Sequence, residues 1–330
     1  MSGGPASCDM RNSRMSLTFT KKKRAYEPPA PLAPIADTHA HLLNFWGKDP
    51  AETLARAALA GDRQLITLLD PIADSLDAPA FHALLEGWIR KAGELLADAP
   101  GLGDAASLLA NVRYLCGVHP YGAPAYTNAV HEQVESALDD PLCAGVGEIG
   151  LDYHMDYDDD VAPAPHEVQI ACMECQLDLA VRRDVPVELH LRNEAGDENR
   201  EAHADAYSAL HNTGVPQAGC ILHCFTEDRA TMERFAGLGC YIAFGGAATF
   251  KRNDDIRAAF AACPLDRILF ETDCPYMAPE PLRGLECEPA MIAFTVDALA
   301  RDRAARTGED PRAIAQAAWD NAGQLFSRKA

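Results

Sequence analysis

The stretch Ile35-Ala-Asp-Thr-His-Ala-His-Leu42 combines the two features from which the fold can be predicted. Its short apolar start predicts a β-strand from Ile35 to His39. His39 and His41 stand two residues apart at the end of that strand, where alternate side chains point to the same side. This arrangement predicts a metal site if other strands end beside the first one.

Further along the chain, short apolar runs alternate with helical patterns, which is typical of strand and helix units around a parallel sheet. Eight such units fit a (β/α)8 TIM-like barrel better than an open doubly wound sheet. The predicted strands are Ile35 to His39, Gln64 to Leu69, Tyr114 to His119, Ala144 to Ile149, Val187 to Leu191, Gly219 to Cys224, Cys240 to Phe244 and Ile268 to Thr272.

The segment 71–112, between the second and third strands, is longer than an ordinary crossover. Apolar residues at helical spacing predict an inserted amphipathic helix there, and a second short segment is expected near Ala105 to Leu109. Packing on the barrel wall is the simpler role for this helix, although it could also shape the site entrance. The residues of its apolar face are Phe81, Leu84, Leu85, Trp88, Ile89, Ala92, Leu95 and Leu96.

The composition, with 48% hydrophobic and 24% charged residues among 330, is that of an ordinary globular protein. No run approaches about 20 uncharged apolar residues, and the N-terminus lacks the apolar block of a secretory signal. We therefore expect a cytoplasmic protein. The 11 cysteines follow no regular framework, which indicates reduced and mostly buried thiols.

Charge is distributed unevenly along the chain. Residues 1–34 mix Ser, Gly and Pro with the basic run Lys21-Lys-Lys-Arg24, so we expect a flexible tail followed by a hydrolase barrel over 35–330. The tail has six basic and two acidic side chains and a net charge of +4, so the remaining residues, which form the body of the protein, carry −24 and the whole chain −20. Such a body disfavours extended binding to duplex nucleic acid but leaves a short or locally held substrate open.

Residues able to bind metal recur at the ends of the predicted strands. Glu148 follows the fourth strand, His190 ends the fifth, His223 ends the sixth and Asp273 ends the eighth. In a parallel barrel all these ends meet at one rim. Six ligands exceed the three that a catalytic zinc takes, so we predict two ions that share one carboxylate. The assignment is His39, His41 and Asp273 to one ion, His190 and His223 to the other, and Glu148 to the bridge.

Two such ions, roughly 3.5 to 4 Å apart, suit in-line displacement at phosphorus by a metal-activated water. Asp273 is placed to accept the proton, so we predict catalytic roles for Asp273 and Glu148. Zinc is the first choice of metal. Manganese, magnesium, iron and nickel remain open, because imidazole and carboxylate ligands suit several divalent ions.

From Ile35 to its C-terminus, the chain resembles the TatD family of metal-dependent hydrolases. Six of its motifs follow one another in the same order as in that family. This resemblance implies a TIM-like barrel, one to three divalent ions and hydrolysis of phosphodiesters, with several members acting as deoxyribonucleases that trim single strands from the 3′ end. Many related superfamily members bridge their metals with a carboxylated lysine after the fourth strand, but the segment at the end of that strand contains no lysine here. The motifs are Asp37-Thr-His-Ala-His-Leu42, Gly117-Val-His-Pro120, Gly145-Val-Gly-Glu-Ile-Gly-Leu-Asp-Tyr153, Pro186-Val-Glu-Leu-His-Leu-Arg192, His223-Cys-Phe225 and Glu271-Thr-Asp-Cys-Pro-Tyr276.

Three residues are candidates for holding the substrate. The resemblance suggests that His119, at the end of the third strand, contacts a substrate phosphate or supports a ligand, while a structural hydrogen bond is an equal alternative. Arg192 could clamp a phosphate oxygen with its planar fork, or instead pair with Glu194 or Asp197. Arg283 is a weaker candidate for the same role.

The chain departs from the family pattern near Arg283-Gly-Leu-Glu-Cys-Glu-Pro289. Leu285 and Cys287 stand where the family usually has Lys and Asn, so a basic and an amide contact are lost. The acidic run from Asp156 to Asp160 adds negative charge near the predicted rim. Both features favour short substrates over long polyanions.

Three functions follow as hypotheses. The leading one is a monomeric phosphodiesterase or deoxyribonuclease acting on short or single-stranded nucleic acid. The alternative is a metal-dependent hydrolase of a small ester, lactone or amide, in which one metal polarises the carbonyl. The third, a non-catalytic metal-binding protein, is disfavoured because the ligand count leaves coordination positions open.

Overall fold

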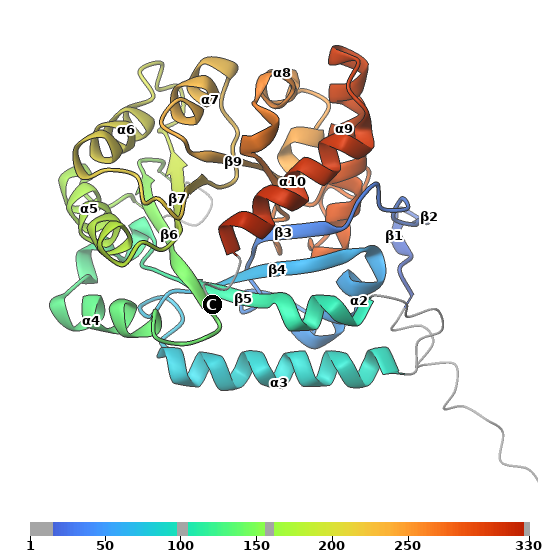
Figure 1. The fold of residues 1–330 in the computed structure, drawn as a ribbon, viewed down its shortest axis with the longest axis horizontal. Coiled ribbons are helices and arrows are strands. Elements are labelled where there is room, and N and C mark those ends of the chain that lie inside the picture. Colours follow the sequence, from blue (N-terminus) through green and yellow to red (C-terminus); the bar gives the residue numbers. More distant parts are fainter. Residues whose placement is uncertain (1–15, 98–104, 156–161, 327–330) are drawn as a thin grey trace, which may run out of the picture.

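The computed structural model describes residues 16–97, 105–155 and 162–326, in which eight parallel strands form a barrel surrounded by helices (Figure 1). Each strand pairs in parallel with the next along the chain, which confirms the predicted TIM-like barrel. The strands are β3 (Ile35–Ala40), β4 (Asp62–Leu69), β5 (Val112–Cys116), β6 (Cys143–Asp152), β7 (Val187–Arg192), β8 (Cys220–Leu222), β9 (Tyr241–Phe244) and β10 (Ile268–Phe270).

The ring closes between its first and last strands through a short backbone bridge and buried polar side chains rather than a long ladder. Ala40 forms an isolated parallel bridge with Cys274. Buried Asp37 accepts hydrogen bonds from the backbone N–H of Thr272 at 2.9 Å and from its hydroxyl at 2.6 Å. The loop after β10 is thereby fixed against the end of β3.

Nine α-helices occur among the described residues. Helix α2 shows how local sequence defines such an element, because Asp49 accepts from two N–H groups of the first turn, Pro50 follows, and Gly61 ends the helix with φ of 112°. The helices are α2 (Pro50–Ala60), α3 (Ala78–Ala97), α4 (Asn128–Ala137), α5 (His166–Arg183), α6 (Glu201–Thr213), α7 (Arg229–Ala236), α8 (Asp254–Ala262), α9 (Ile292–Thr307) and α10 (Pro311–Phe326). Within the described ranges, none combines the length and apolarity needed to cross a bilayer.

Helix α10 covers the amino ends of the strands. Its Leu325 and Phe326 are buried in one cluster with residues that fill the barrel interior, including Ile66 and Leu115. Asn321 donates from its side-chain amide to the carbonyl of Ile268 at the start of β10, at 2.9 Å. This end of the barrel is therefore closed by packing.

The inserted helix is α3, which runs along the outside of the barrel (Figure 1). It packs against α2, and its Phe81 meets Tyr114 edge to face with ring centroids 5.1 Å apart. Leu84, expected on the apolar face, is exposed instead. The second short segment forms the 3-10 turn Ala105–Asn111. These contacts agree with packing of α3 on the barrel wall rather than with a role in shaping the site entrance.

The expectation of a flexible tail needs correction for residues 16–34. Strands β1 (Phe19–Lys21) and β2 (Arg24–Tyr26) form an antiparallel hairpin. Phe19 is buried, with its ring 6.0 Å from that of Phe294, and Lys21 Nζ donates to the carbonyl of Pro281 at 2.9 Å. Phe19 and the partly buried Leu17 and Tyr26 thus pack a segment onto the core that its composition predicted to be solvated. Residues 1–15 and the acidic run 156–160 lie outside the described residues.

Candidate metal centre

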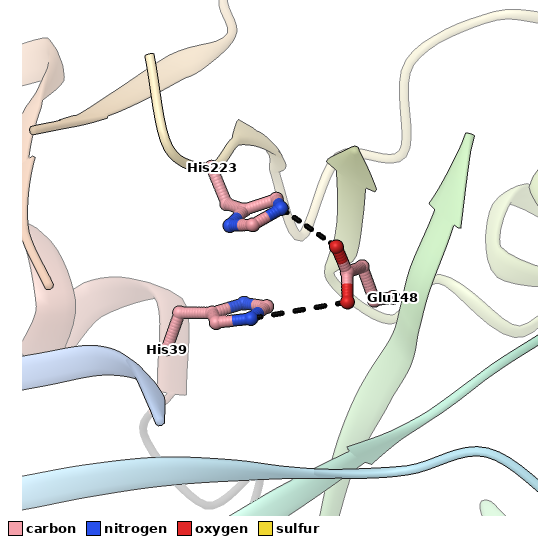
Figure 2. A group of neighbouring side chains, drawn as sticks. All are labelled: His39, Glu148 and His223. Carbon is pink, nitrogen blue, oxygen red and sulfur yellow. Dashed lines mark ion pairs between the residues drawn. The ribbon is translucent and has the colours of Figure 1, made fainter. Parts of the chain in front are cut away.

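The six predicted ligands come together at the carboxyl ends of the strands. His39 and His190 lie in the last residues of β3 and β7, His41, His223 and Asp273 lie in the loops just after β3, β8 and β10, and Glu148 lies within β6, four residues before its end. Figure 2 shows His39, Glu148 and His223 facing one another from three separate elements. The rings of His39 and His223 stack with centroids 3.9 Å apart, so both present an edge to Glu148.

One ligand group surrounds the Oε2 side of Glu148. The Nε2 atoms of His39 and His41 lie 2.9 Å apart. Asp273 Oδ1 lies 3.7 and 3.5 Å from these two nitrogens. Glu148 Oε2 completes the group at 3.9 and 3.8 Å from them.

A second group surrounds the other oxygen of the same carboxylate. Glu148 Oε1 lies 2.7 Å from His223 Nε2 and 2.8 Å from His190 Nδ1, and the two nitrogens are 3.2 Å apart. Ligand atoms arranged tetrahedrally about an ion at ~2.1 Å would be about 3.4 Å from one another. The separations in the first group, from 2.9 to 3.9 Å, bracket this value, whereas those in the second group, from 2.7 to 3.2 Å, are shorter. The imidazole and carboxylate donors of both groups suit divalent cations.

Two carboxylates that sequence reasoning missed orient the ligand histidines. Glu188 Oε1 lies 2.5 Å from His39 Nδ1, and Asp152 Oδ2 lies 3.1 Å from His190 Nε2. Each contact engages the ring nitrogen that faces away from the ligand group, and so leaves the other nitrogen free for a metal. The signal was present, because Glu188 precedes His190 by two residues and Asp152 follows Glu148 by four, on the same faces of their strands.

Electrostatics within the cluster follow from burial and close contacts. Burial lowers the pKa of His39 well below its usual range, with a further contribution from the nearby His223. Burial would raise the pKa of Glu148, but the neighbouring His223 and His190 outweigh it and hold that pKa well below normal. Neutral imidazole and ionised carboxylate are the metal-binding forms of these groups.

His190 behaves differently from His39. Burial alone would lower its pKa, but hydrogen bonds with Asp152 and Glu148 outweigh that effect and raise the pKa to about 10. A proton therefore competes with a cation at this ring, and a cation must displace it to bind.

His119 borders the second group, and one of its ring nitrogens lies close enough to Glu148 and His190 to form a third set of possible ligand atoms. Its Nδ1 accepts a hydrogen bond from the backbone N–H of Tyr121 at 3.2 Å, so the neutral ring carries its proton on Nε2. That nitrogen lies 4.0 Å from Glu148 Oε1. Burial, together with the nearby His190, lowers the pKa of His119 to about 3 and keeps the ring neutral. His119 thus presents an N–H donor, rather than a lone pair, to the site.

The two candidate arginines differ in position. Arg192 Nη1 lies 3.8 Å from Asp152 Oδ2, next to the carboxylate that orients His190. The guanidinium of Arg283 instead stacks on the ring of Phe250, 4.2 Å from its centroid. The geometry keeps Arg192 as a candidate substrate contact and gives Arg283 a packing role.

The second half of the segment that departs from the family pattern, Cys287 to Pro289, is buried in the protein interior. Cys287 is fully buried, and Leu285 packs against the core. The neighbouring Glu288 is buried and accepts from both Lys48 and Arg56. Leu285 and Cys287, which stand where the family usually has Lys and Asn, therefore stabilise the loop instead of reaching toward a ligand.

Comparison with known proteins is consistent with this geometry. A family described as TatD related DNase matches residues 36–327. The chain is 32% identical over 264 residues to the uncharacterized metal-dependent hydrolase YcfH of Escherichia coli K12, covering 77% of this chain and 92% of the relative. It is 31% identical over 254 residues to the protein named 3'-5' ssDNA/RNA exonuclease TatD of Edwardsiella piscicida, covering 76% and 91%.

Solved structures agree at the level of the fold. The crystal structure of YJJV, a TatD homologue from Escherichia coli, superposes with a TM-score of 0.67 at 27% identity, covering 90% of this chain and 99% of that one. The lactonase Lmo2620 from Listeria monocytogenes superposes with a TM-score of 0.56 at 13% identity, covering 90% and 97%. The second likeness concerns the barrel alone.

Proposed function

The chain belongs to the family of TatD-related DNases and is a metal-dependent hydrolase, and we propose that it hydrolyses phosphodiester bonds in short or single-stranded nucleic acid. The observation that carries this proposal is the position of Glu148, whose two oxygens face two separate groups of ligand atoms. A relative named as a single-strand exonuclease supports the choice of substrate.

The proposed ligands follow the two groups. His39, His41 and Asp273 would hold one ion, and His190 and His223 would hold the other, with Glu148 shared between them. Two divalent ions, zinc by preference, would supply Lewis acidity toward the phosphate and a nucleophilic water at neutral pH. Glu188 and Asp152 would act as positioning residues, because they fix the rings of His39 and His190.

Three side chains of the protein would act on the substrate itself. Asp273 would accept the proton of the attacking water, because its carboxylate lies beside the ligand group at the open rim. The Nε2–H of His119 would donate to a phosphate oxygen, which favours the substrate role over a purely structural one. Arg192 would contact a second phosphate oxygen from the exposed side of the site.

The charge of the protein limits the size of the substrate. Residues 35–330 carry a net charge of −24. Lys48, which lies near the rim, is paired with Glu288. Few phosphates can therefore be held at once, so short or single strands are favoured over duplex. We expect the protein to act as a monomer.

Hydrolysis of a small ester or lactone is the second candidate. It is favoured by Leu285 and Cys287, which remove a basic and an amide contact from the segment 283–289. The same ligand groups would then polarise a carbonyl instead of a phosphoryl group.

A substrate panel separates the two candidates. The protein, loaded with each divalent metal in turn, would be assayed against single-stranded oligo-dT, bis(p-nitrophenyl) phosphate, p-nitrophenyl acetate and a simple lactone. We expect the two phosphodiesters to be cleaved with much higher kcat/KM than the carboxyl esters. Preference for the lactone or acetate would establish the second candidate instead.

A further inference from the structure

The exposed large hydrophobic side chains of the described residues gather around the metal centre. Trp46, Tyr121, Tyr276 and Met277 lie on the loops that follow β3, β5 and β10, and Leu84 on α3 is the exception. A clustered set of exposed aromatic rings indicates a binding surface, whereas isolated ones do not.

Two of these rings form a ladder that begins at a proposed metal ligand. The ring of Tyr276 meets that of His41 edge to face at 6.0 Å, and the ring of Trp46 follows at 6.4 Å from Tyr276. Exposure rises outward, from 43% for Tyr276 to 68% for Trp46. The ladder therefore leads from the ligand group out to solvent.

A third ring lies beside the second ligand group. Tyr121 meets His119 edge to face with centroids 4.7 Å apart, and His119 in turn lies 4.6 Å from the ring of His190. Aromatic side chains thus stand beside both ligand groups of Glu148.

The position of Trp46 is fixed by the loop that follows Tyr276. The backbone N–H groups of Trp46 and Gly47 both donate to Oε1 of Glu286, and Lys48 donates to Glu288. Tyr276 is held by its own N–H, which donates to the carbonyl of Asp273 at 2.9 Å. These bonds fix the backbone of both loops, so less backbone freedom is lost when the rings bind.

Nucleobases are the occupants that this surface suits. Every base offers a flat face, and stacking on an aromatic side chain contributes about 1–3 kcal/mol per base without sequence preference. A protein this acidic gains little affinity from phosphates, so base stacking is the available source. Bases inside a duplex are already stacked and paired, whereas those of a single strand are free to bind.

We propose that Trp46 and Tyr276 form a stacking platform for the nucleobases beside the scissile phosphate of a single strand, with Tyr121 contacting a base on the other side. This inference rests on the proposed function, because it places the phosphate at the metal centre. It assigns to these rings the selection of single strands over duplex.

Kinetics on two substrates of equal length test the platform. Metal-loaded wild type, Trp46→Ala and Leu84→Ala would be compared on oligo-dT and on an oligomer made of abasic sites. Trp46→Ala should raise KM for oligo-dT about 5- to 100-fold with little change in kcat, and should have a much smaller effect on the abasic oligomer. Leu84→Ala, which removes an exposed hydrophobic side chain far from the rim, should behave as wild type. An unchanged KM for oligo-dT in Trp46→Ala would overturn the platform.

Fluorescence gives a readout that does not depend on turnover. Of the three tryptophans, Trp46 is the exposed one, while Trp88 and Trp319 are partly buried. A hydrolysis-resistant phosphorothioate oligo-dT should quench the fluorescence saturably in wild type and in Leu84→Ala, and much less in Trp46→Phe. Quenching without hydrolysis of any phosphodiester would refute the proposed function and keep the platform. Hydrolysis without quenching would refute the platform, and would point to a protein partner for these rings.

Discussion

The two ends of the barrel differ in what the same strands contribute to them. At the carboxyl ends, six of the eight strands, with their loops, bring together histidines and carboxylates that contact one another at 2.5 to 4.0 Å. At the amino ends, apolar side chains from the strands pack against Leu325 and Phe326 of α10. The carboxyl ends of the strands therefore hold the binding site, and the amino ends contribute apolar packing. Substitutions at the carboxyl ends should change activity, whereas substitutions at the amino ends should change stability.

The largest effect on turnover should come from Asp273→Asn at the carboxyl end. The amide keeps the size of the side chain but cannot accept a proton, so kcat should fall on the order of 10² to 10⁴-fold. Steady-state hydrolysis of oligo-dT gives this number, and thermal unfolding should show an intact fold. Nearly normal turnover would mean that another group accepts the proton.

The amino end should show the opposite behaviour. Leu325→Ala removes a buried side chain beneath the barrel and should lower the free energy of unfolding by about 2–5 kcal/mol, as measured by urea denaturation. The kcat/KM of the remaining folded protein should be unchanged. If kcat/KM falls in parallel with stability, the two ends of the barrel are coupled, and activity and stability do not depend on separate ends.

A smaller effect is expected where a side chain supports a ligand without binding metal. Glu188→Gln keeps the shape beside His39 but weakens the contact at Nδ1, and should reduce metal affinity about 10- to 100-fold. Competition with a chelator of known affinity measures this change. Glu94→Gln, on the exposed face of α3, serves as the matched control and should have no effect.

Most of the fold could be predicted from sequence because its signals are local. The eight apolar runs predict the eight strands. Because parallel strands end at one rim, the sequence also predicts that His39, Glu148 and Asp273 lie close together. Strand ends were less exact, since β5 stops at Cys116 and leaves His119 in the following turn. Composition, by contrast, could not reveal that the buried ring of Phe19 helps to anchor the hairpin on the core.

The supporting features of the site were harder to predict because they depend on distance across the barrel. Glu188 orients a histidine on a strand that is remote in sequence, and the tautomer of His119 depends on one backbone N–H in the next turn. The aromatic ladder joins Trp46 to Tyr276, from opposite ends of the chain. Only closure of β3 onto β10 brings these loops together.

The smallest predicted effect concerns salt. If few phosphates are held, the logarithm of kcat/KM for oligo-dT should fall only weakly with the logarithm of salt concentration, by a slope near one or two in magnitude. Replacing Lys22 and Lys23, which are exposed on the N-terminal hairpin, by Gln should change this slope little. A steep slope that the double replacement flattens would show that the hairpin binds the phosphate backbone.

The central claim is that Glu148 joins two metal sites, and metal content tests it most directly. Protein saturated with zinc and freed of excess ion should contain close to two equivalents per chain by elemental analysis. The Glu148→Ala variant should bind less than two, with weakened affinity for what remains, while its unfolding transition shows a folded protein. Two tightly held ions in Glu148→Ala, or a single equivalent in the wild type, would contradict the account.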